Sequence, residues 1–254
     1  FRAIDLGTPI GQNPRAGVGA NGISQNGDHV VGHSVWVPFV WDRGTGMRAL
    51  QLGSGHQLAQ ANAVDDRGVA VGSSGTLLGG SGAAVWDLAG TFRSLHQAGW
   101  DWSTALGINN AGTVLVVAGV PIGGQTKQRT FIGPLTGPLF DLTPGAGTAA
   151  AYDINERGQI CLVVDGLPFR YTPSIGLEAV GPFQPERIND QGQMVGRDPA
   201  TGDVVRRTDG VGWQALGAAP RGGFREVGGI DAFGRIVVTE WVRTSVSPPA
   251  YAHY

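Results

Sequence analysis

One short phrase recurs along the chain about every 40 residues, and it constrains the fold more than any other feature. It reads INNAG at 108–112, INERG at 154–158 and INDQG at 188–192. An Ile or Val stands four residues before its glycine, and a Ser, Asp or Asn stands three before it. The phrase glycines are Gly27, Gly68, Gly112, Gly158, Gly192 and Gly234. A fixed period of this length is typical of repeat proteins.

The phrase predicts a tight hairpin turn in each repeat. An Asx side chain accepts a hydrogen bond from the backbone two residues further on, and glycine supplies the positive φ that such turns need. β-branched runs such as HVVG and VAVG follow the glycines, as expected for a second strand. We therefore interpret the repetition as structural rather than chemical.

A second signature completes each unit. An apolar fourth-strand residue follows a third-strand position by nine residues in five copies, without any insertion. The pairs are Trp41 and Leu50, Trp86 and Leu95, Gly133 and Leu142, Tyr171 and Val180, and Arg207 and Leu216. Each unit is thus expected to contain four short strands.

Six such units predict an all-β fold, a six-bladed β-propeller of four-stranded antiparallel blades. We expect a single domain over residues 1–254. Its blade turns lie near 24–27, 65–68, 109–112, 155–158, 189–192 and 231–234. The last copy is cut short, since YAHY at 251–254 resembles a third strand and FRAI at 1–4 resembles a fourth. The N-terminal strand is therefore expected to close the last blade.

Composition narrows the classes of partner. The net charge is −2 and no run of Lys or Arg occurs, which argues against a nucleic-acid partner. No apolar stretch is long enough to span a membrane. Cys161 is the single cysteine, so an intrachain disulfide and a cysteine-based zinc site are both excluded. We expect a monomer with a small-molecule or glycan ligand, and the sequence identifies no cofactor.

The repeats resemble the HAF-repeat family of bacterial, mostly extracellular proteins. The likeness lies in the A-x-x-I-N-x-x-G-x-x-V turns, the aromatic third strand and endings such as RAIDLG and WQALG. The tripeptide that names the family is replaced by PFVW, AAVW and PFRY, and YAHY keeps a trace of it. The resemblance implies a propeller and an extracellular or periplasmic location. It carries over no catalytic residue.

Length differences between the copies predict where function lies. The turn between the first and second strands and the segment between the third and fourth keep their lengths, whereas the other two kinds of connection vary. Those variable connections emerge on one face of an up-and-down blade, and insertions in repeat proteins gather on the binding face. Since their residues do not repeat, we expect one asymmetric site at the channel mouth.

Aromatic and charged residues near the variable connections are the candidate ligand-binding groups. They are Trp36, Trp100, Trp102, Glu186, Arg221, Arg225 and Trp241. Tryptophan rings stack on sugar C–H groups or planar ligands, and Arg binds carboxylates or phosphates in a bidentate manner. The alternative is that the rings fill gaps between blades and that the charges form ordinary ion pairs between them.

Histidines provide the candidate acid–base groups. His33, His56 and His96 lie in or beside variable connections of the first repeats, so two of them could converge. The candidate catalytic residues are His33, His56, Tyr152 and Arg187, an arrangement suited to abstraction of a proton beside a carboxylate. His33 and His56 could instead share a metal, although no metal site is predicted; loop histidines often serve for hydrogen bonding alone.

These observations lead to two hypotheses. In the first, the chain is a single-site ligand-binding propeller, possibly an enzyme of lyase or hydrolase type that acts on a carbohydrate or a carboxylated small molecule. In the second, it is a non-catalytic scaffold that binds a protein partner on its variable face. A deep polar pocket would favour the first, and a flat aromatic patch the second.

Overall fold

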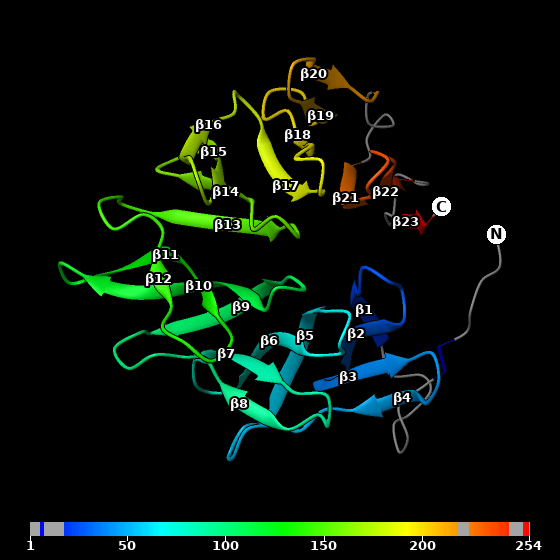
Figure 1. Cartoon of the computed structure of the whole chain (residues 1–254), viewed down its shortest axis with the longest axis vertical. Coiled ribbons are helices and arrows are strands. Elements are labelled where there is room, and N and C mark those ends of the chain that lie inside the picture. Colours follow the sequence, from blue (N-terminus) through cyan, green and yellow to red (C-terminus); the bar gives the residue numbers. More distant parts are fainter. Residues whose placement is uncertain (1–5, 8–17, 218–223, 244–250, 254) are drawn as a thin grey trace. The chain divides into compact units, whose positions relative to one another are not determined.

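The computed structural model describes residues 6–7, 18–217, 224–243 and 251–253. Every regular element in this part of the chain is a β-strand, and it contains no helix that could cross a membrane. The strands form antiparallel sheets, five with four strands and one with three, and each sheet follows the order of the chain (Figure 1). The all-β class and the four-stranded repeat are therefore confirmed.

The chain divides into two compact units, Phe1–Gly145 and Ala146–Tyr254. The number of blades in a ring, its closure and the single domain stay predictions. The closing strand was expected at residues 1–4, which lie outside the described residues. The third strand of the last sheet, β23 (Tyr251–His253), pairs with the strand before it as expected.

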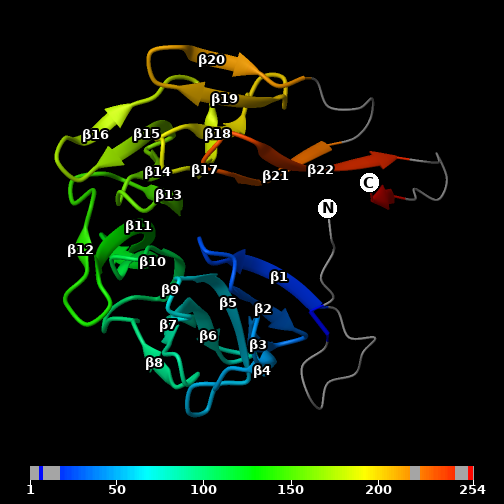
Figure 2. The ribbon, with the colours of Figure 1, turned by 45° about the vertical axis from the view of Figure 1, so that its right-hand side comes forward.

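The first unit contains three sheets. Their strands are β1 (Val18–Ile23), β2 (His29–Ser34), β3 (Val37–Asp42) and β4 (Gly46–Ala49); β5 (Leu58–Val64), β6 (Ala70–Gly75), β7 (Ser81–Trp86) and β8 (Phe92–Ser94); β9 (Trp102–Ile108), β10 (Thr113–Ile122), β11 (Gln125–Pro134) and β12 (Phe140–Asp141). The first strands β1, β5 and β9 lie side by side (Figure 2).

The second unit contains the other three sheets. Their strands are β13 (Ala149–Ile154), β14 (Ile160–Val164), β15 (Leu167–Thr172) and β16 (Gly176–Ala179); β17 (Gln184–Ile188), β18 (Met194–Arg197), β19 (Val204–Thr208) and β20 (Gly212–Ala215); β21 (Phe224–Ile230), β22 (Ile236–Arg243) and β23. Here too the first strands β13, β17 and β21 are neighbours.

Alternation of side chains explains the packing of the sheets. On β7, Ala83 and Val85 pack with residues of the sheet β9–β12, whereas Ala84 and Trp86 pack with residues of the sheet β1–β4. A strand places successive side chains on opposite faces, so a strand covered on both sides has no polar face. Trp86 is fully buried. Trp213, three residues before the fourth-strand residue Leu216, is 39% exposed and packs against Phe183.

The predicted turns are confirmed. All six phrase glycines have a positive φ, between 72° and 82°. The Asx side chain acts as expected: Asn189 Oδ1 accepts the backbone N–H of Gln191 at 3.1 Å, and Asp65 Oδ1 accepts that of Arg67 at 3.0 Å. The structure adds a second role for this position, since Asn155 Nδ2 also donates to the carbonyl of Asn189 in the next sheet at 2.8 Å.

Each first strand also contains a β-bulge at one repeated position. The bulged residues are Asn21, Asn62, Leu106, Tyr152, Glu186 and Gly228. A bulge re-aims its side chain and increases the local twist. Asn21 Nδ2 and Asn62 Nδ2 use this to donate to the carbonyls of Ala61 and Ala105 on the next first strand, at 2.9 and 2.8 Å. These two bulges thus join neighbouring sheets.

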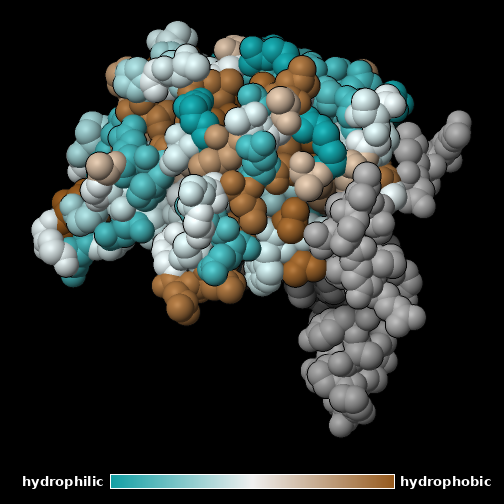
Figure 3. Space-filling view, turned by 90° about the horizontal axis from the view of Figure 1, so that it is seen from below, coloured by the Kyte–Doolittle hydropathy of each residue, from teal (hydrophilic) through white to brown (hydrophobic). Residues whose placement is uncertain are grey.

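On the face shown in Figure 3, hydrophobic patches are separated by hydrophilic side chains. Among the described residues, large exposed hydrophobic side chains include Leu77 and Leu78 in the β6–β7 loop, which are 63% and 103% exposed.

Candidate functional site

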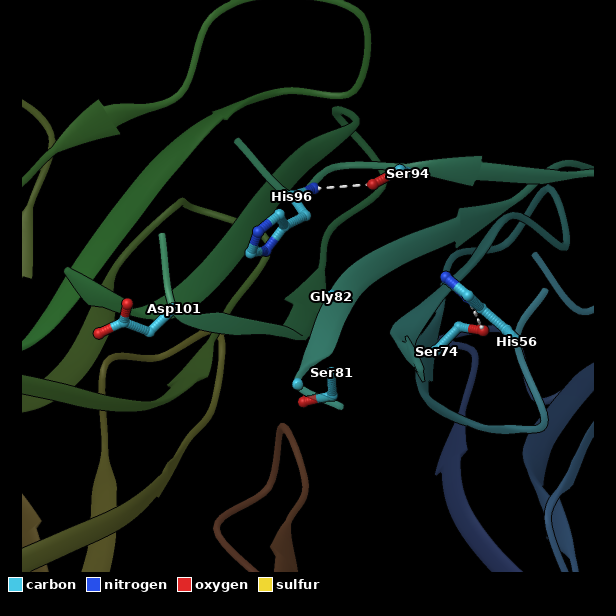
Figure 4. Close-up of a pocket in the computed structure, with 8 residues that line it drawn as sticks. His56, Ser74, Ser81, Gly82, Ser94, His96 and Asp101 are labelled. Atoms are coloured by element: carbon cyan, nitrogen blue, oxygen red, sulfur yellow. Dashed lines mark hydrogen bonds between the residues drawn. The ribbon is translucent and has the colours of Figure 1, made fainter. Parts of the chain in front are cut away.

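A pocket of about 310 Å³ lies at one end of the sheet β5–β8 (Figure 4). We call it the histidine pocket. Its lining residues are His56, Ser74, Gly80, Ser81, Gly82, Ser94, His96 and Asp101. Its volume is at the lower end of the range for small-molecule sites.

The pocket is assembled from both kinds of variable connection. His56 lies between β4 and β5, and His96 and Asp101 lie between β8 and β9. Gly80 belongs to the β6–β7 loop. The sequence predicted that these connections share the functional face, and in this sheet they line one cavity. Of the three histidines singled out by position, His56 and His96 are brought together here.

His56 is held at its Nδ1 atom. Nδ1 lies 2.8 Å from the Oγ of Ser74, a fully buried residue of β6. Ser74 Oγ in turn donates to the carbonyl of Leu58 at 3.3 Å. The ring also meets Phe92 edge-to-face, with centroids 5.6 Å apart. These contacts fix the orientation of the imidazole.

His96 is held in a similar way by the next sheet. Its Nδ1 lies 2.8 Å from the Oγ of Ser103 on β9, and Ser103 Oγ also accepts the backbone N–H of Ala83 at 2.8 Å. The backbone N–H of His96 donates to Ser94 Oγ at 3.1 Å (Figure 4). Its ring meets Trp100 edge-to-face, at 5.9 Å between centroids.

Two glycines make room for the imidazoles. Gly82 is the cross-strand partner of Ser74, and Figure 4 shows the two histidines on opposite sides of it. A Cβ at Gly82 would lie 3.1 Å from the Cβ of His96. A Cβ at Gly53 would lie 2.5 Å from the Nδ1 of His56. Neither glycine is replaceable without moving a histidine.

Asp101 connects the pocket to the longest hairpin of the first unit. Its carboxylate Oδ2 accepts a hydrogen bond from Thr126 Oγ1 on β11, and its backbone N–H donates to the carbonyl of Gly119 on β10 at 2.8 Å. The third repeat carries its extra length as extended strands β10 and β11 rather than as loop. The lining contains no Lys or Arg, so its polar groups are imidazoles, hydroxyls and this one carboxylate.

The other catalytic candidates occupy separate places. His33 on β2 has its Nδ1 3.4 Å from Asn21 Nδ2 and does not line the histidine pocket. Tyr152 belongs to the second unit, where it packs against the cluster around Cys161 and Met194. Arg187, on β17, donates from Nη1 to the carbonyl of Glu186 at 2.8 Å and from Nε to that of Gly228 at 3.3 Å.

The ligand-binding candidates differ in their surroundings. Trp36 is 56% exposed in the β2–β3 turn. Trp100 packs on Phe131, with centroids 4.5 Å apart, which is the gap-filling arrangement weighed as an alternative. Trp102 begins β9 and covers Gly119. Glu186 is buried and pairs with Arg197 at 2.5 Å, so it forms an ion pair within its own sheet.

The remaining candidates lie in less completely described parts of the chain. Arg221 is outside the described residues. Arg225 and Trp241 are placed on β21 and β22 by their backbones. Among the described residues, no group of three or more His, Cys, Asp or Glu side chains could hold a metal ion.

Asp153 is a buried carboxyl group on β13 of the second unit. Burial raises the pKa of Asp153 to about 6, although Oδ2 accepts the N–H of Ile188 at 3.0 Å and Arg187 lies nearby. Burial likewise raises the pKa of the Cys161 thiol well above its usual value. Asp153 on β13 and Cys161 on β14 are cross-strand partners.

The serines of the histidine pocket were not predicted. Ser74, Ser81 and Ser94 line the pocket, and Ser103 contacts His96; none of them belongs to a column that all six repeats share, and serine is common in strands and turns of every kind. Predicting the pocket serines would have required the register of β6 against β7, which places Ser74 opposite Gly82.

No model of a known protein family matches the chain, and no curated protein matches it. Solved structures do match in fold. They include an acylaminoacyl peptidase of Pyrococcus horikoshii, with a TM-score of 0.61 and 11% identity, covering 93% of this chain and 43% of that chain. Streptogramin B lyase gives a TM-score of 0.54 at 15% identity, covering 90% of this chain and 76% of that chain.

A protein described as TolB from Agrobacterium tumefaciens gives a TM-score of 0.53 at 12% identity, covering 94% of this chain and 80% of that chain. TolB and streptogramin B lyase are β-propellers, so the chain is similar to β-propellers in its fold. Identities this low carry no information about its ligand.

Proposed function

We propose that the protein is a single-site ligand-binding β-propeller, which holds a small, neutral, hydroxyl-rich molecule such as a carbohydrate in the histidine pocket. The observation that carries this proposal is the lining, which offers two imidazoles and three serine hydroxyls but no Lys or Arg. Neutral imidazoles and hydroxyls can each donate and accept hydrogen bonds, as sugar hydroxyls require. In this proposal six blades close into a ring through the N-terminal strand.

A carboxylated ligand fits the pocket less well. Binding an anion beside Asp101 would need a compensating cation, since an unpaired charge is costly to desolvate. Arg187 was the expected partner for a carboxylate, but its Nε and Nη1 already donate to backbone carbonyls. The pocket therefore favours a carbohydrate over a carboxylated small molecule as the ligand.

An enzyme of lyase or hydrolase type is the finer form of this proposal. The fold similarity to a lyase and to part of a peptidase supports a propeller that can carry an enzyme site. The same proposal includes membership of the HAF-repeat family and an extracellular or periplasmic location. Both rest on the repeat phrases and their endings.

The alternative is a non-catalytic scaffold that binds a protein partner. It is favoured by the exposed Leu77 and Leu78, which lie in the loop that leads into the pocket at Gly80. Exposed apolar side chains beside a pocket can serve a protein partner as well as the rim of a ligand site.

Thermal unfolding against a panel of neutral sugars and the matching sugar acids tests the proposal. A ligand at 100 times its Kd contributes about 2.7 kcal/mol, or about 5–10 °C in Tm for a chain of this size. We expect a neutral sugar to give this shift, and His56→Gln and His96→Gln to abolish it while His33→Gln retains it. Stabilisation by the sugar acids instead, or an equal loss in His33→Gln, would refute the placement of the site. No shift with any panel member would favour the scaffold.

A further inference from the structure

The two histidines of the pocket are held by serines with different hydrogen-bond obligations. Each imidazole has its Nδ1 2.8 Å from a serine Oγ, and both serines are fully buried. A serine hydroxyl has a single proton and can accept further bonds. What each serine does with that proton therefore decides which nitrogen of its histidine is protonated.

The hydroxyl proton of Ser74 has an acceptor in the backbone. Ser74 Oγ lies 3.3 Å from the carbonyl oxygen of Leu58, which can accept this proton, and a hydroxyl that donates there accepts from His56 Nδ1 at 2.8 Å. His56 then carries its proton on Nδ1, and its Nε2 has a free lone pair. An imidazole in this state is a proton acceptor at Nε2.

Ser103 is in the opposite situation. Its Oγ already accepts the N–H of Ala83 at 2.8 Å, and a buried hydroxyl that donates to nothing is costly. Among the described residues, the other hydrogen-bond partner of Ser103 Oγ is His96 Nδ1, which can accept this proton. His96 then carries its own proton on Nε2 and is a hydrogen-bond donor there.

We propose that Ser74 and Ser103 hold His56 and His96 in opposite neutral tautomers, and that the histidine pocket is thereby a proton-transfer site. This inference rests on the proposed function. His56 Nε2 takes a proton from a carbon next to a carbonyl group of a neutral hydroxylated substrate. The C–H electron pair forms a C=C bond, and the carbonyl oxygen becomes an enolate oxygen that accepts a hydrogen bond from His96 Nε2–H.

The proton on His56 then completes one of two balanced reactions. In isomerisation it is delivered to the former carbonyl carbon, while the enolate oxygen takes up the proton that the hydroxyl group on the deprotonated carbon gives up, and that group becomes the new carbonyl. In elimination the C=O bond re-forms, a C=C bond forms to the next carbon as its C–O bond breaks, and the departing oxygen leaves with the His56 proton. Neither needs an oxidant, a reductant or a second substrate. Ser74 and Ser103 are positioning residues in this scheme, and His56 is the catalytic base.

Long-range ¹H–¹⁵N NMR of the free protein tests the tautomers without any ligand. We expect the Nδ1–H form for His56 and the Nε2–H form for His96. Ser103→Ala should remove the preference of His96 and leave His56 unchanged, and Ser73→Ala, its buried control on β6, should change neither. Identical tautomers in the two rings would overturn the assignment even if a sugar binds.

Exchange of the carbon-bound hydrogens of dihydroxyacetone for deuterium in D₂O tests the proton-transfer step. This probe is neutral and has carbon-bound hydrogens beside its carbonyl. We expect the exchange rate to fall at least 10-fold in His56→Gln and to be unchanged in His33→Gln. Exchange no faster than in His56→Gln would overturn the proton-transfer role. Loss of sugar binding with both tautomers intact would instead remove the proposed function alone.

Discussion

The side-chain amide of Asn189 donates a 2.7 Å hydrogen bond to the backbone carbonyl of Asp231, which occupies the same turn position in the next sheet. The same Nδ2 also donates to Gln193 Oε1 at 2.9 Å, and Oδ1 accepts the N–H groups of Gln191 and Gln193. One buried amide therefore closes its own turn and joins two sheets. Asn155 makes the equivalent set of hydrogen bonds, whereas the Ser or Asp of other copies has no side-chain amide with which to donate.

Replacement of this amide by a carboxylate should separate the two duties. Asn189→Asp keeps the acceptor oxygens but loses both donations and turns a negative oxygen towards a carbonyl. We expect a loss of about 2–4 kcal/mol in the free energy of unfolding, measured by urea denaturation.

A matched variant supplies the control. Asp65 occupies the equivalent position in the second sheet, and there Arg67, two residues later, pairs with it at 2.6 Å. Arg157 stands two residues after Asn155, so it can pair with the new carboxylate of Asn155→Asp as Arg67 pairs with Asp65. The residue two after Asn189 is Gln191, which carries no charge. We expect the loss in Asn155→Asp to be about half that in Asn189→Asp. Equal losses would contradict the role given to the arginine.

The fold could be predicted further than the site because folding uses repeated residues. Turn glycines such as Gly192 recur in every copy of the phrase, and apolar fourth-strand residues such as Leu95 recur in five copies. The bulge at Asn62 and its equivalents was not predicted, because a bulge depends on the register between two strands, which no single strand reveals. The pocket serines depend on the same register and recur in no column.

Asp153 should make the stability of the protein depend on pH. The folded state takes up a proton below about pH 6, whereas the unfolded chain does so near the ordinary value of 3.8. The contribution of Asp153 to stability therefore grows as the pH falls from about 7 to 4, by at most about 3 kcal/mol. Subtracting the urea-denaturation profile of Asp153→Asn from that of the wild type isolates this contribution. A difference that is flat across the window would show that the carboxyl is not desolvated.

The thiol of Cys161 should not react with thiol reagents in the folded protein. Its side chain is fully buried and its thiol pKa is raised, so the reactive thiolate is scarce and inaccessible. We expect no reaction with Ellman's reagent in buffer and one equivalent per chain in denaturant. Rapid labelling without denaturant would mean that the β13–β14 ladder opens readily.

The glycines beside the histidines should be intolerant of a methyl group. Gly53→Ala places a Cβ 2.5 Å from His56 Nδ1, so the ring must leave Ser74. We expect a change in the His56 imidazole NMR signals and at least a 10-fold weaker affinity for any sugar that stabilises the wild type. Gly145→Ala, whose Cβ would meet nothing within 4 Å, is the control and should change neither.

The most direct measurement is a titration of histidine-labelled protein with the neutral sugars, followed through the imidazole signals. The histidine pocket predicts that one sugar shifts His56 and His96 together along a single binding curve, while His29 and His33 keep their positions. If every sugar leaves His56 and His96 unmoved, or if all histidines shift alike, the pocket is not the ligand site.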